Sequence, residues 1–243
     1  MATKRMRVFA GPNGSGKTTI ITNLKNKIPF GVYVNADDIE RELKTTDTLG
    51  FNQYNLLLNT QLVQLHFKTS NLSPIKHSNA NYWKYISVKD NKLLIDLSLE
   101  VDSYLSADIA ELLRVELLNA GMDFSYETVM SHPEKVNFLK NARLNGYRVY
   151  LYYIATEDPE ININRVNVRV AQDGHTVSAD KIKSRYYKSL ENLKAAVKQT
   201  SRTYIFDNSG TTSLLIAEIT DGITVDVFDP EKAPNWFVKY LVE

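Results

Sequence analysis

The feature that most constrains the fold of this chain is the segment Gly-Pro-Asn-Gly-Ser-Gly-Lys-Thr at residues 11–18. It matches the phosphate-binding loop pattern, which is a glycine, four residues, a second glycine, a lysine, and a serine or threonine. The apolar run before it, residues 6–10, predicts a buried strand, and residues 18–26 after it predict a helix. Strand, loop and helix is the order that the pattern requires. We therefore expect the chain to bind a nucleoside triphosphate.

The loop's composition explains how it would hold phosphate. Glycines let the backbone curl until successive N–H groups and the positive end of the following helix point at one anion. Lys17 then supplies a charge for the terminal phosphates, and Thr18 supplies a hydroxyl for Mg²⁺. A glycine-rich turn that arose by chance is disfavoured because both flanks fit. The residues expected to bind ATP or GTP are Gly11, Pro12, Asn13, Gly14, Ser15, Gly16, Lys17, Thr18, Thr19 and Asn208.

Composition limits what else the chain can be. Its 243 residues are 43% hydrophobic and 23% charged, which allows one large core or a core with an appendage. The absence of cysteine excludes disulfides and thiolate metal sites, and the four histidines lack metal-ligand spacing. Mg²⁺ is the one metal indicated. With neither a signal peptide nor a membrane-spanning run, a cytoplasmic protein without a membrane partner is expected.

Strands that alternate with helices predict an α/β fold of the phosphate-loop type, with a mainly parallel sheet and helices on both faces. Polar residues follow the predicted strands at 32–35, 123–126 and 202–206, so Asp37/Asp38, Glu127/Thr128 and Asp207/Asn208 should share one sheet edge with the loop. A hairpin is expected around Asp221-Gly222. We predict a single domain over residues 1–243, with an insertion at about 44–105.

Several further helices and strands are expected from residues that commonly begin or end such elements. Helices are predicted at 39–43, 52–67 and 106–120, and another after a capping box that begins at Ser131. Asp158-Pro159 should start a helix, and Ser178 should cap a basic helix that reaches about residue 197. A strand buried on both faces is predicted at 148–154, and a hairpin at 85–88 and 93–95. Trp236 is expected to pack in the core.

Missing signatures narrow the class of phosphate-loop protein. A GTPase needs Asn-Lys-x-Asp, and the nearest match, residues 91–94, lacks the aspartate. The Leu-Ser-Gly-Gly-Gln signature and the Asp-Glu strand end of transporter-type ATPases do not occur. Small-molecule kinases remain. In these, an acid after the second strand receives the acceptor's proton and an arginine-bearing lid clamps the phosphates.

Candidate acids follow two of the predicted strands. Asp37 or Asp38 could orient an acceptor hydroxyl and accept its proton. Either could instead cap the short helix that follows, and both roles are compatible if one aspartate caps while the other faces the site. Glu127 is a candidate for binding magnesium or the acceptor, with a salt bridge as the alternative.

Candidate phosphate-binding arginines lie on two helices. Arg165 and Arg169, four residues apart, share a helix face, and Arg185 lies on the next helix. Arginines here could stabilise transition-state charge, whereas pairing with Glu157, Glu160 or Asp173 is the alternative for one of them. Residues 165–202 hold nine Lys or Arg against three acids, either as a solvated helix face or to neutralise the triphosphate. His175 is expected to form loop hydrogen bonds.

Seven motifs in order resemble the zeta toxin family of phosphate-loop kinases, in particular its chromosomal branch. They are Gly-Pro-Asn-Gly-Ser-Gly-Lys-Thr, Val-Asn-Ala-Asp-Asp-Ile, Phe-Ser-Tyr-Glu-Thr-Val-Met-Ser, Asn-Gly-Tyr-Arg-Val-Tyr-Leu, Arg-Val-x-x-Arg-Val with Gly-His-Thr-Val, Arg-Tyr-Tyr-x-Ser-Leu, and Asp-Asn-Ser. They span residues 6–45 and 106–210. The resemblance implies ATP-dependent phosphorylation of the sugar 3-hydroxyl of UDP-N-acetylglucosamine, and inhibition by a small helical antitoxin.

The resemblance also implies roles for single residues. The general base would be Asp37 and the phosphate lysine Lys17. Contacts to substrate or Mg²⁺ would fall to Glu127 and Thr128, and phosphate contacts to Arg169 and Arg185 beside Lys17. Asp38 and Arg165 complete the expected substrate site.

Two departures concern the acceptor. Glu40 stands where well-studied members have a basic residue, with Arg41 one position later, and residues 44–105 are longer than usual. The acceptor therefore stays open. Alternatives to a small-molecule kinase are an ATP-binding interaction protein without phosphotransfer, and a nucleic-acid end kinase that uses the 165–202 run, although nucleic acid is not an expected partner.

Overall fold

The computed structural model describes residues 3–70, 72, 79–171 and 177–242, and the chain divides into two compact units. The first consists of Met1–Phe30 and Ser125–Glu243, and the second of Gly31–Phe124. Within the described residues, no helix has the length and apolar character needed to cross a membrane. The single domain with an insertion at 44–105 stays a prediction.

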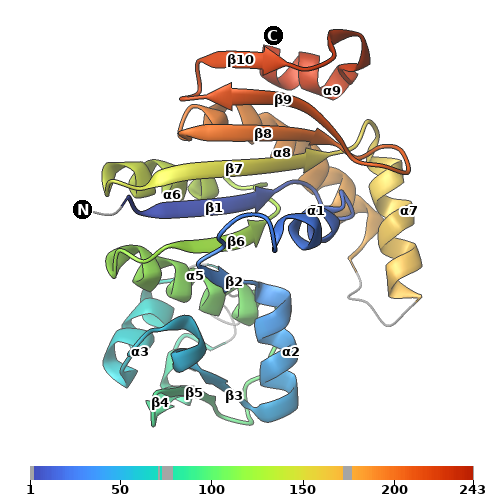
Figure 1. Ribbon diagram of the computed structural model, residues 1–243. Coiled ribbons are helices and arrows are strands. Elements are labelled where there is room, and N and C mark those ends of the chain that lie inside the picture. The colour runs from blue at the N-terminus through green and yellow to red at the C-terminus, as the bar shows by residue number, and fades with distance from the viewer. Residues whose placement is uncertain (1–2, 71, 73–78, 172–176, 243) are drawn as a thin grey trace. The chain divides into compact units, whose positions relative to one another are not determined.

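The first unit is built on a sheet whose strands lie in the order β10-β9-β8-β7-β1-β6 (Figure 1). β7 pairs in parallel with both β1 and β8, and β8, β9 and β10 pair antiparallel. The predicted α/β fold with a mainly parallel sheet and a C-terminal hairpin is confirmed. The strands are β1 (Arg5–Ala10), β6 (Phe124–Thr128), β7 (Arg148–Ala155), β8 (Arg202–Asp207), β9 (Leu214–Thr220) and β10 (Thr224–Val227).

Helices cover both faces of this sheet, as predicted (Figure 1). α1 (Lys17–Leu24) lies on one face, and α6 (Pro133–Leu144) and α8 (Ala179–Val197) lie on the other. α7 (Pro159–Val170) packs on α8. Residues facing α6 and α8, such as Leu151, are fully buried.

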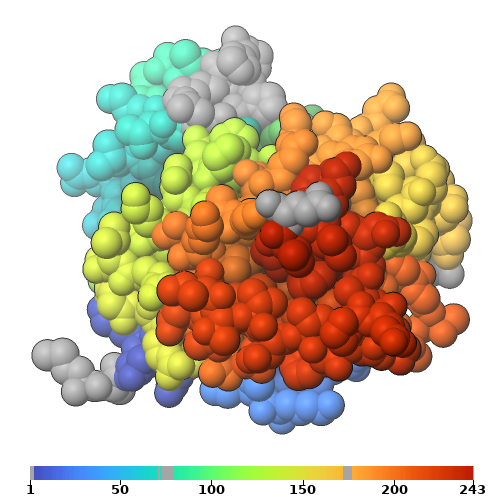
Figure 2. Space-filling model, turned by 90° about the horizontal axis from the view of Figure 1, so that it is seen from above, coloured from blue at the N-terminus to red at the C-terminus, as the bar shows by residue number. Residues whose placement is uncertain are grey.

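The C-terminal segment closes one end of the first unit. After β10 the chain forms the short helix α9 (Asn235–Phe237), which continues as a π-helix over Val238–Val242. Trp236 is 3% exposed, so the prediction that it packs in the core is confirmed. Figure 2 shows the hairpin and these helices, in orange-red to red, at the surface of this end of the unit.

The second unit contains a small antiparallel sheet in the order β3-β5-β4, and α2 packs on α5. The predicted hairpin is confirmed, and both turn residues, Asp90 and Asn91, have the positive φ angles that such a turn needs. β3 was not predicted. The elements are β2 (Val32–Val34), α2 (Ala36–Thr46), β3 (Thr48–Gly50), α3 (Thr60–Thr69), β4 (Ile86–Lys89), β5 (Lys92–Ile95) and α5 (Ser103–Asn119), with 3-10 helices at Phe51–Tyr54 and Tyr82–Tyr85.

Local chemistry corrects three sequence predictions. The helix predicted over 52–67 is interrupted, because Asn55 adopts a left-handed conformation and the Asn59 side chain caps a new helix at Thr60. α6 is capped by His132 and not by Ser131, since Pro133, which lacks an N–H, occupies the first helical position. Ser178 precedes α8 without making a side-chain capping bond.

Candidate nucleotide-binding site

Close contacts with the rest of the first unit require the glycines of the phosphate-binding loop. A Cβ atom on Gly11 would lie 1.9 Å from the carbonyl oxygen of Ile154, and one on Gly16 would lie 2.1 Å from Asn208 Nδ2. All three glycines of the loop have positive φ angles, of 143°, 76° and 94° in chain order. The loop is therefore fitted between the end of β7, the start of α7 and the segment after β8.

The loop is arranged to receive an anion. Gly16 precedes α1 without a side-chain cap, and the first turn of that helix holds no acid. Lys17 Nζ donates to the carbonyl oxygens of Gly11 at 2.8 Å and Pro12 at 3.0 Å. Ser15 Oγ is buried and has no hydrogen-bond partner in the described part of the chain. Polar groups around an uncapped helix start fit a triphosphate.

The same geometry fits Mg²⁺ only together with phosphate. The residues that the structure describes contain no group of three or more His, Cys, Asp or Glu side chains that could hold a metal. Thr18 is exposed in the first turn of α1. Its hydroxyl can supply one oxygen ligand, and Mg²⁺ commonly takes substrate phosphates and water for the others.

Two asparagine side chains hold the loop from opposite sides. Asn208 Nδ2 donates to the carbonyl oxygen of Ser15 at 2.8 Å. Asn162 Nδ2 donates to that of Asn13 at 2.6 Å, while its Oδ1 accepts from the Thr156 hydroxyl. Sequence reasoning missed Asn162 and Thr156. A polar residue on the buried face of an otherwise apolar helix is the signal that could have found Asn162.

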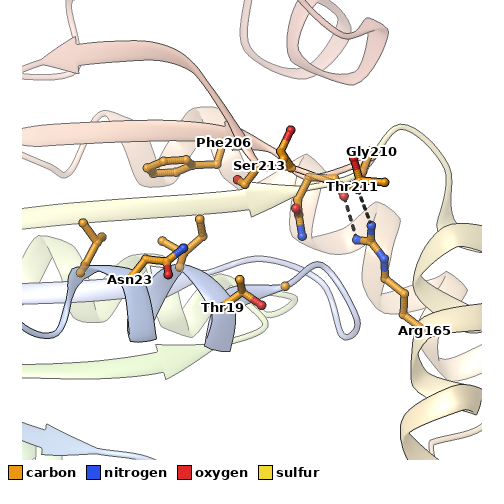
Figure 3. Close-up of a pocket in the computed structure, with 12 residues that line it drawn as sticks. Thr19, Asn23, Arg165, Phe206, Gly210, Thr211 and Ser213 are labelled. Atoms are coloured by element: carbon orange, nitrogen blue, oxygen red, sulfur yellow. Dashed lines mark hydrogen bonds between the residues drawn. The ribbon is translucent and has the colours of Figure 1, made fainter.

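Arg165 fastens the segment that carries Asn208. Its Nη1 donates to the carbonyl oxygen of Asn208 at 2.7 Å, and its Nη2 donates to that of Gly210 at 3.1 Å (Figure 3). The preceding Asp207 carboxylate accepts from the Ser209 hydroxyl at 2.8 Å and from the Trp236 indole at 3.0 Å. The turn after β8 is thus held by side chains from α7 and the C-terminal helix. The substrate contact expected of Arg165 stays a prediction.

A pocket of about 630 Å³ adjoins the loop. Figure 3 shows Phe206 of β8 and Ser213 on one side, with Thr19 and Asn23 of α1 on the other. Ligand pockets commonly enclose roughly 300–1,000 Å³, so a nucleoside is of suitable size. Apolar and hydroxyl side chains line the pocket together: Gly16, Thr19, Ile20, Asn23, Leu24, Arg165, Phe206, Asn208, Gly210, Thr211, Thr212 and Ser213.

The end of β6 lies beside the start of the loop. Gly11 N–H donates to the carbonyl oxygen of Thr128 at 3.2 Å, and Thr128 Oγ1 accepts from Met130 N–H at 3.1 Å. α8 fixes this turn, because Ser189 Oγ donates to the carbonyl oxygen of Val129 at 2.7 Å. Glu127 precedes Thr128 on β6 and is half-buried.

Arg169 and Arg185 lie on α7 and α8, on either side of residues 172–176 in the chain. Arg169 is exposed and Arg185 is half-buried, and neither makes an ion pair or side-chain hydrogen bond among the described residues. The predicted partners Glu157 and Glu160 instead contact Asn235 and Lys183. Asp173 and His175 lie outside the described residues.

Asp37 and Asp38 belong to the second unit, in the first turn of α2. Neither caps the helix, because Asn35 Oδ1 accepts the Asp37 N–H at 2.9 Å. The Asp38 carboxylate binds the guanidinium of Arg41, whereas the exposed Asp37 carboxylate has no partner within the described ranges. The Asp37 carboxylate is therefore more available than that of Asp38 to contact a ligand.

Glu40, the residue that departs from the zeta toxin pattern, is 3% exposed in α2. Lys44, one turn later, donates to its carboxylate at 2.6 Å. The carboxylate is thus paired within its own helix.

Comparison with protein families gives a match between residues 101–220 and the zeta toxin family. The resemblance to zeta toxins is confirmed. An uncharacterized protein of Haemophilus influenzae is 36% identical over 63 residues, which are 26% of this chain and 45% of that protein. This chain therefore matches less than half of that relative.

Two solved structures share the fold of this chain. The PezAT chromosomal toxin–antitoxin system of Streptococcus pneumoniae superposes with a TM-score of 0.54 at 15% identity, over 100% of this chain and 80% of that one. The AvrRxo1-ORF1:AvrRxo1-ORF2 complex with sulfate ions superposes with a TM-score of 0.55 at 13% identity, over 95% of this chain and 62% of that one. A further AvrRxo1 structure contains ATP. At these identities the likeness concerns the fold.

Proposed function

We propose that the protein is an ATP-dependent kinase that transfers the γ-phosphate to a hydroxyl group of a small molecule. The observation that carries this proposal is the anion-binding loop beside the 630 Å³ pocket. The loop would hold the phosphates and the pocket the nucleoside. The match to the zeta toxin family and the fold shared with an ATP-containing structure support this assignment.

The proposed reaction forms a bond between the acceptor oxygen and the γ-phosphorus. The bond from that phosphorus to the bridging oxygen breaks, so ADP leaves, and the acceptor's proton passes to Asp37. Asp37 is favoured over Asp38 because Arg41 already binds the Asp38 carboxylate. Lys17, Arg169 and Arg185 would stabilise the phosphate charge in the transition state. Mg²⁺ held through Thr18 would neutralise part of that charge.

As acceptor we propose a sugar hydroxyl of a nucleotide sugar such as UDP-N-acetylglucosamine. The support is the family match over residues 101–220, which include the expected substrate contacts Glu127, Thr128 and Arg165. Glu40 argues for testing more than one acceptor, since it places a paired carboxylate where a basic residue is usual. A protein antitoxin is a proposed partner, supported by the fold shared with the PezAT system.

The test is incubation with ATP, Mg²⁺ and a panel of nucleotide sugars, followed by mass spectrometry of the products. We expect one acceptor to gain a single phosphate. Removing one charge or one base that acts in the transition state typically costs 10²-fold or more, so Lys17→Ala and Asp37→Asn should each lower turnover by about that factor.

Matched variants separate loss of chemistry from loss of folding. Lys25→Ala removes an exposed lysine just after α1, and Glu42→Gln neutralises a carboxylate of α2 five positions after Asp37; both should retain activity. Unchanged turnover in Asp37→Asn would remove Asp37 as the base. ATP binding without phosphorylation of any acceptor would favour a nucleotide-dependent interaction protein instead.

A further inference from the structure

The sheet of the first unit carries arginines and tyrosines on the face that bears α1. Strand pairing aligns Arg7, Tyr150 and Arg202 in one row, and Phe9, Tyr152 and Tyr204 in the next. Arg148 lies two residues before Tyr150 and therefore on the same face. We call Arg7, Arg148, Tyr150, Tyr152, Arg202 and Tyr204 the arginine–tyrosine face.

Helix coverage of this face is incomplete within the first unit. α1 lies over the carboxyl ends of β1 and β7, whereas no described helix of the unit lies over their amino ends (Figure 1). Arg148 is exposed, and Tyr150, Arg202 and Tyr204 are half-buried. A partner could therefore reach these four side chains from solvent. The opposite face is fully buried along β7, where Val149, Leu151 and Tyr153 have no exposed surface.

The aromatic rings are packed against one another and against the guanidinium groups. The Tyr152 ring stacks between those of Phe9 and Tyr204, with centroids 4.8 and 5.1 Å away and interplanar angles of 18° and 19°. Tyr150 contacts two cations, the guanidinium carbons of Arg7 at 5.1 Å and Arg148 at 5.6 Å from its centroid. The rings of Tyr150 and Tyr152 are thus already in contact with neighbouring side chains.

The arginine–tyrosine face holds more arginines than carboxylates that pair with them in the described part of the chain. Arg7 is only 5% exposed, and its Nε and Nη1 atoms have no hydrogen-bond partner among the described residues. In the same described ranges no carboxylate pairs with Arg7 or Arg148, whereas Arg202 pairs with Glu218. A buried cation without a counter-ion costs free energy, and a nearby external carboxylate lowers that cost.

We propose that the arginine–tyrosine face is a docking surface for an acidic segment of a protein partner. Carboxylates of the partner would pair with Arg148 and approach the positive charge of Arg7, and the tyrosines would supply contact area. Tyr and Arg, together with Trp, are enriched in interface hot spots. Single-stranded nucleic acid is disfavoured, because base recognition on a sheet needs ring faces free for stacking, and both faces of Tyr152 and one face of Tyr204 are occupied.

The direct test uses a fluorescent oligoglutamate peptide and the full chain, with binding followed by fluorescence anisotropy. We expect Arg148→Glu to weaken binding about tenfold, and added salt to weaken binding to the unmodified chain. Lys188→Glu is the matched control, since Lys188 is an exposed cation of α8, on the opposite side of the sheet. It should leave binding within about twofold.

A second variant tests the buried arginine separately from folding. Arg7→Met keeps a long apolar stem but removes the unpaired charge, so we expect weaker peptide binding without a loss of stability in urea unfolding. Equal weakening by Arg148→Glu and Lys188→Glu would show non-specific attraction and overturn the proposal, as would no binding at all. An oligothymidylate that competes with the peptide and is lost in Arg148→Glu would assign the surface to nucleic acid, which also overturns it.

Discussion

Asn208 shows how a single side chain far along the chain shapes the phosphate-binding loop. Its amide group donates to the carbonyl oxygen of Ser15, and its backbone N–H donates to that of Ala155, each at 2.8 Å. The same amide nitrogen occupies the space that a Cβ atom on Gly16 would need. The glycine of the loop and the asparagine after β8 are therefore matched to each other.

From this contact we predict that Asn208→Ala weakens ATP binding. One hydrogen bond to the loop is lost, and a net bond is worth about 0.5–1.5 kcal/mol, or roughly 2- to 12-fold in affinity. Calorimetric titration with ATP measures the change without requiring an acceptor. Asn26→Ala, at an exposed position after α1, is the control. Unaltered affinity in Asn208→Ala would show that the loop keeps its shape without this bond.

The phosphate-binding loop itself could be predicted from the sequence. The distant side chains that hold it in place could not. The glycine and lysine spacing identifies the loop because backbone conformation and charge at fixed positions are local properties. Asn162 escaped prediction, since its partner Asn13 lies 149 positions away and only the fold brings them together. The substrate contact expected of Arg165 stays a prediction, and the two backbone carbonyl oxygens that its guanidinium binds were not foreseen.

At the scale of elements, helix starts were predicted correctly where neighbouring residues determine them. They were predicted wrongly where a residue is compatible with several conformations. Asp158 and Pro159 start α7 as expected, because the aspartate accepts the N–H of Glu160 and the proline needs no partner for its own nitrogen. The helix predicted over 52–67 contains Asn55 and Asn59, which interrupt it. An asparagine is compatible with helix, left-handed turn or cap, and tertiary contacts decide among them.

A contact between a half-buried histidine and a buried aspartate joins two elements of the second unit. His66 of α3 contacts Asp108 of α5, with 2.8 Å between Nε2 and Oδ1, and the aspartate is fully buried. Tyr82 also approaches that carboxylate, at 3.5 Å, and its hydroxyl donates to the carbonyl oxygen of Phe67. Asp108 therefore connects α5 to α3 and to the 3-10 helix that contains Tyr82.

We predict that Asp108→Ala destabilises the protein by about 3 kcal/mol, because it removes the side-chain acceptor of His66 and empties the space of a fully buried side chain. Urea unfolding followed by circular dichroism measures the loss. Glu100→Ala, at an exposed site shortly before α5, should change stability by less than about 0.5 kcal/mol. A loss below about 1 kcal/mol in Asp108→Ala would mean that water or a neighbouring group replaces the contact.

At the scale of the whole molecule, the sequence predicted the fold class, and its single domain with an insertion at about 44–105 stays a prediction. Alternating strands and helices indicate a parallel sheet from local patterns alone. The boundary of the second unit is harder to foresee. Gly31 and Phe124, at its two ends, lie far apart in the chain, and a Cβ on Gly31 would lie 2.9 Å from Phe124 N. A boundary of this kind depends on contacts between distant segments, which composition does not mark.

Buried tyrosines spread through both units give the whole molecule a common response to alkaline pH. Burial raises the pKa of Tyr152 to about 12, an effect that the nearby Arg7 cation partly opposes. Burial likewise raises the pKa values of Tyr54, Tyr82, Tyr153 and Tyr186 above the ordinary value. The folded protein therefore retains protons that the unfolded chain releases.

We predict that the free energy of unfolding falls as pH rises from about 10 towards 12. In this window the unfolded chain ionises first, so each buried tyrosine contributes stability that is fully present below the unfolded pKa and is lost as pH rises through the folded one. Urea unfolding across the range measures the slope, and tyrosinate absorbance reports ionisation. Tyr152→Phe should make the slope shallower, whereas Tyr85→Phe, at an exposed site, should not. Equal slopes in Tyr152→Phe and the unmodified chain would show that Tyr152 ionises in the folded state as readily as in the unfolded one.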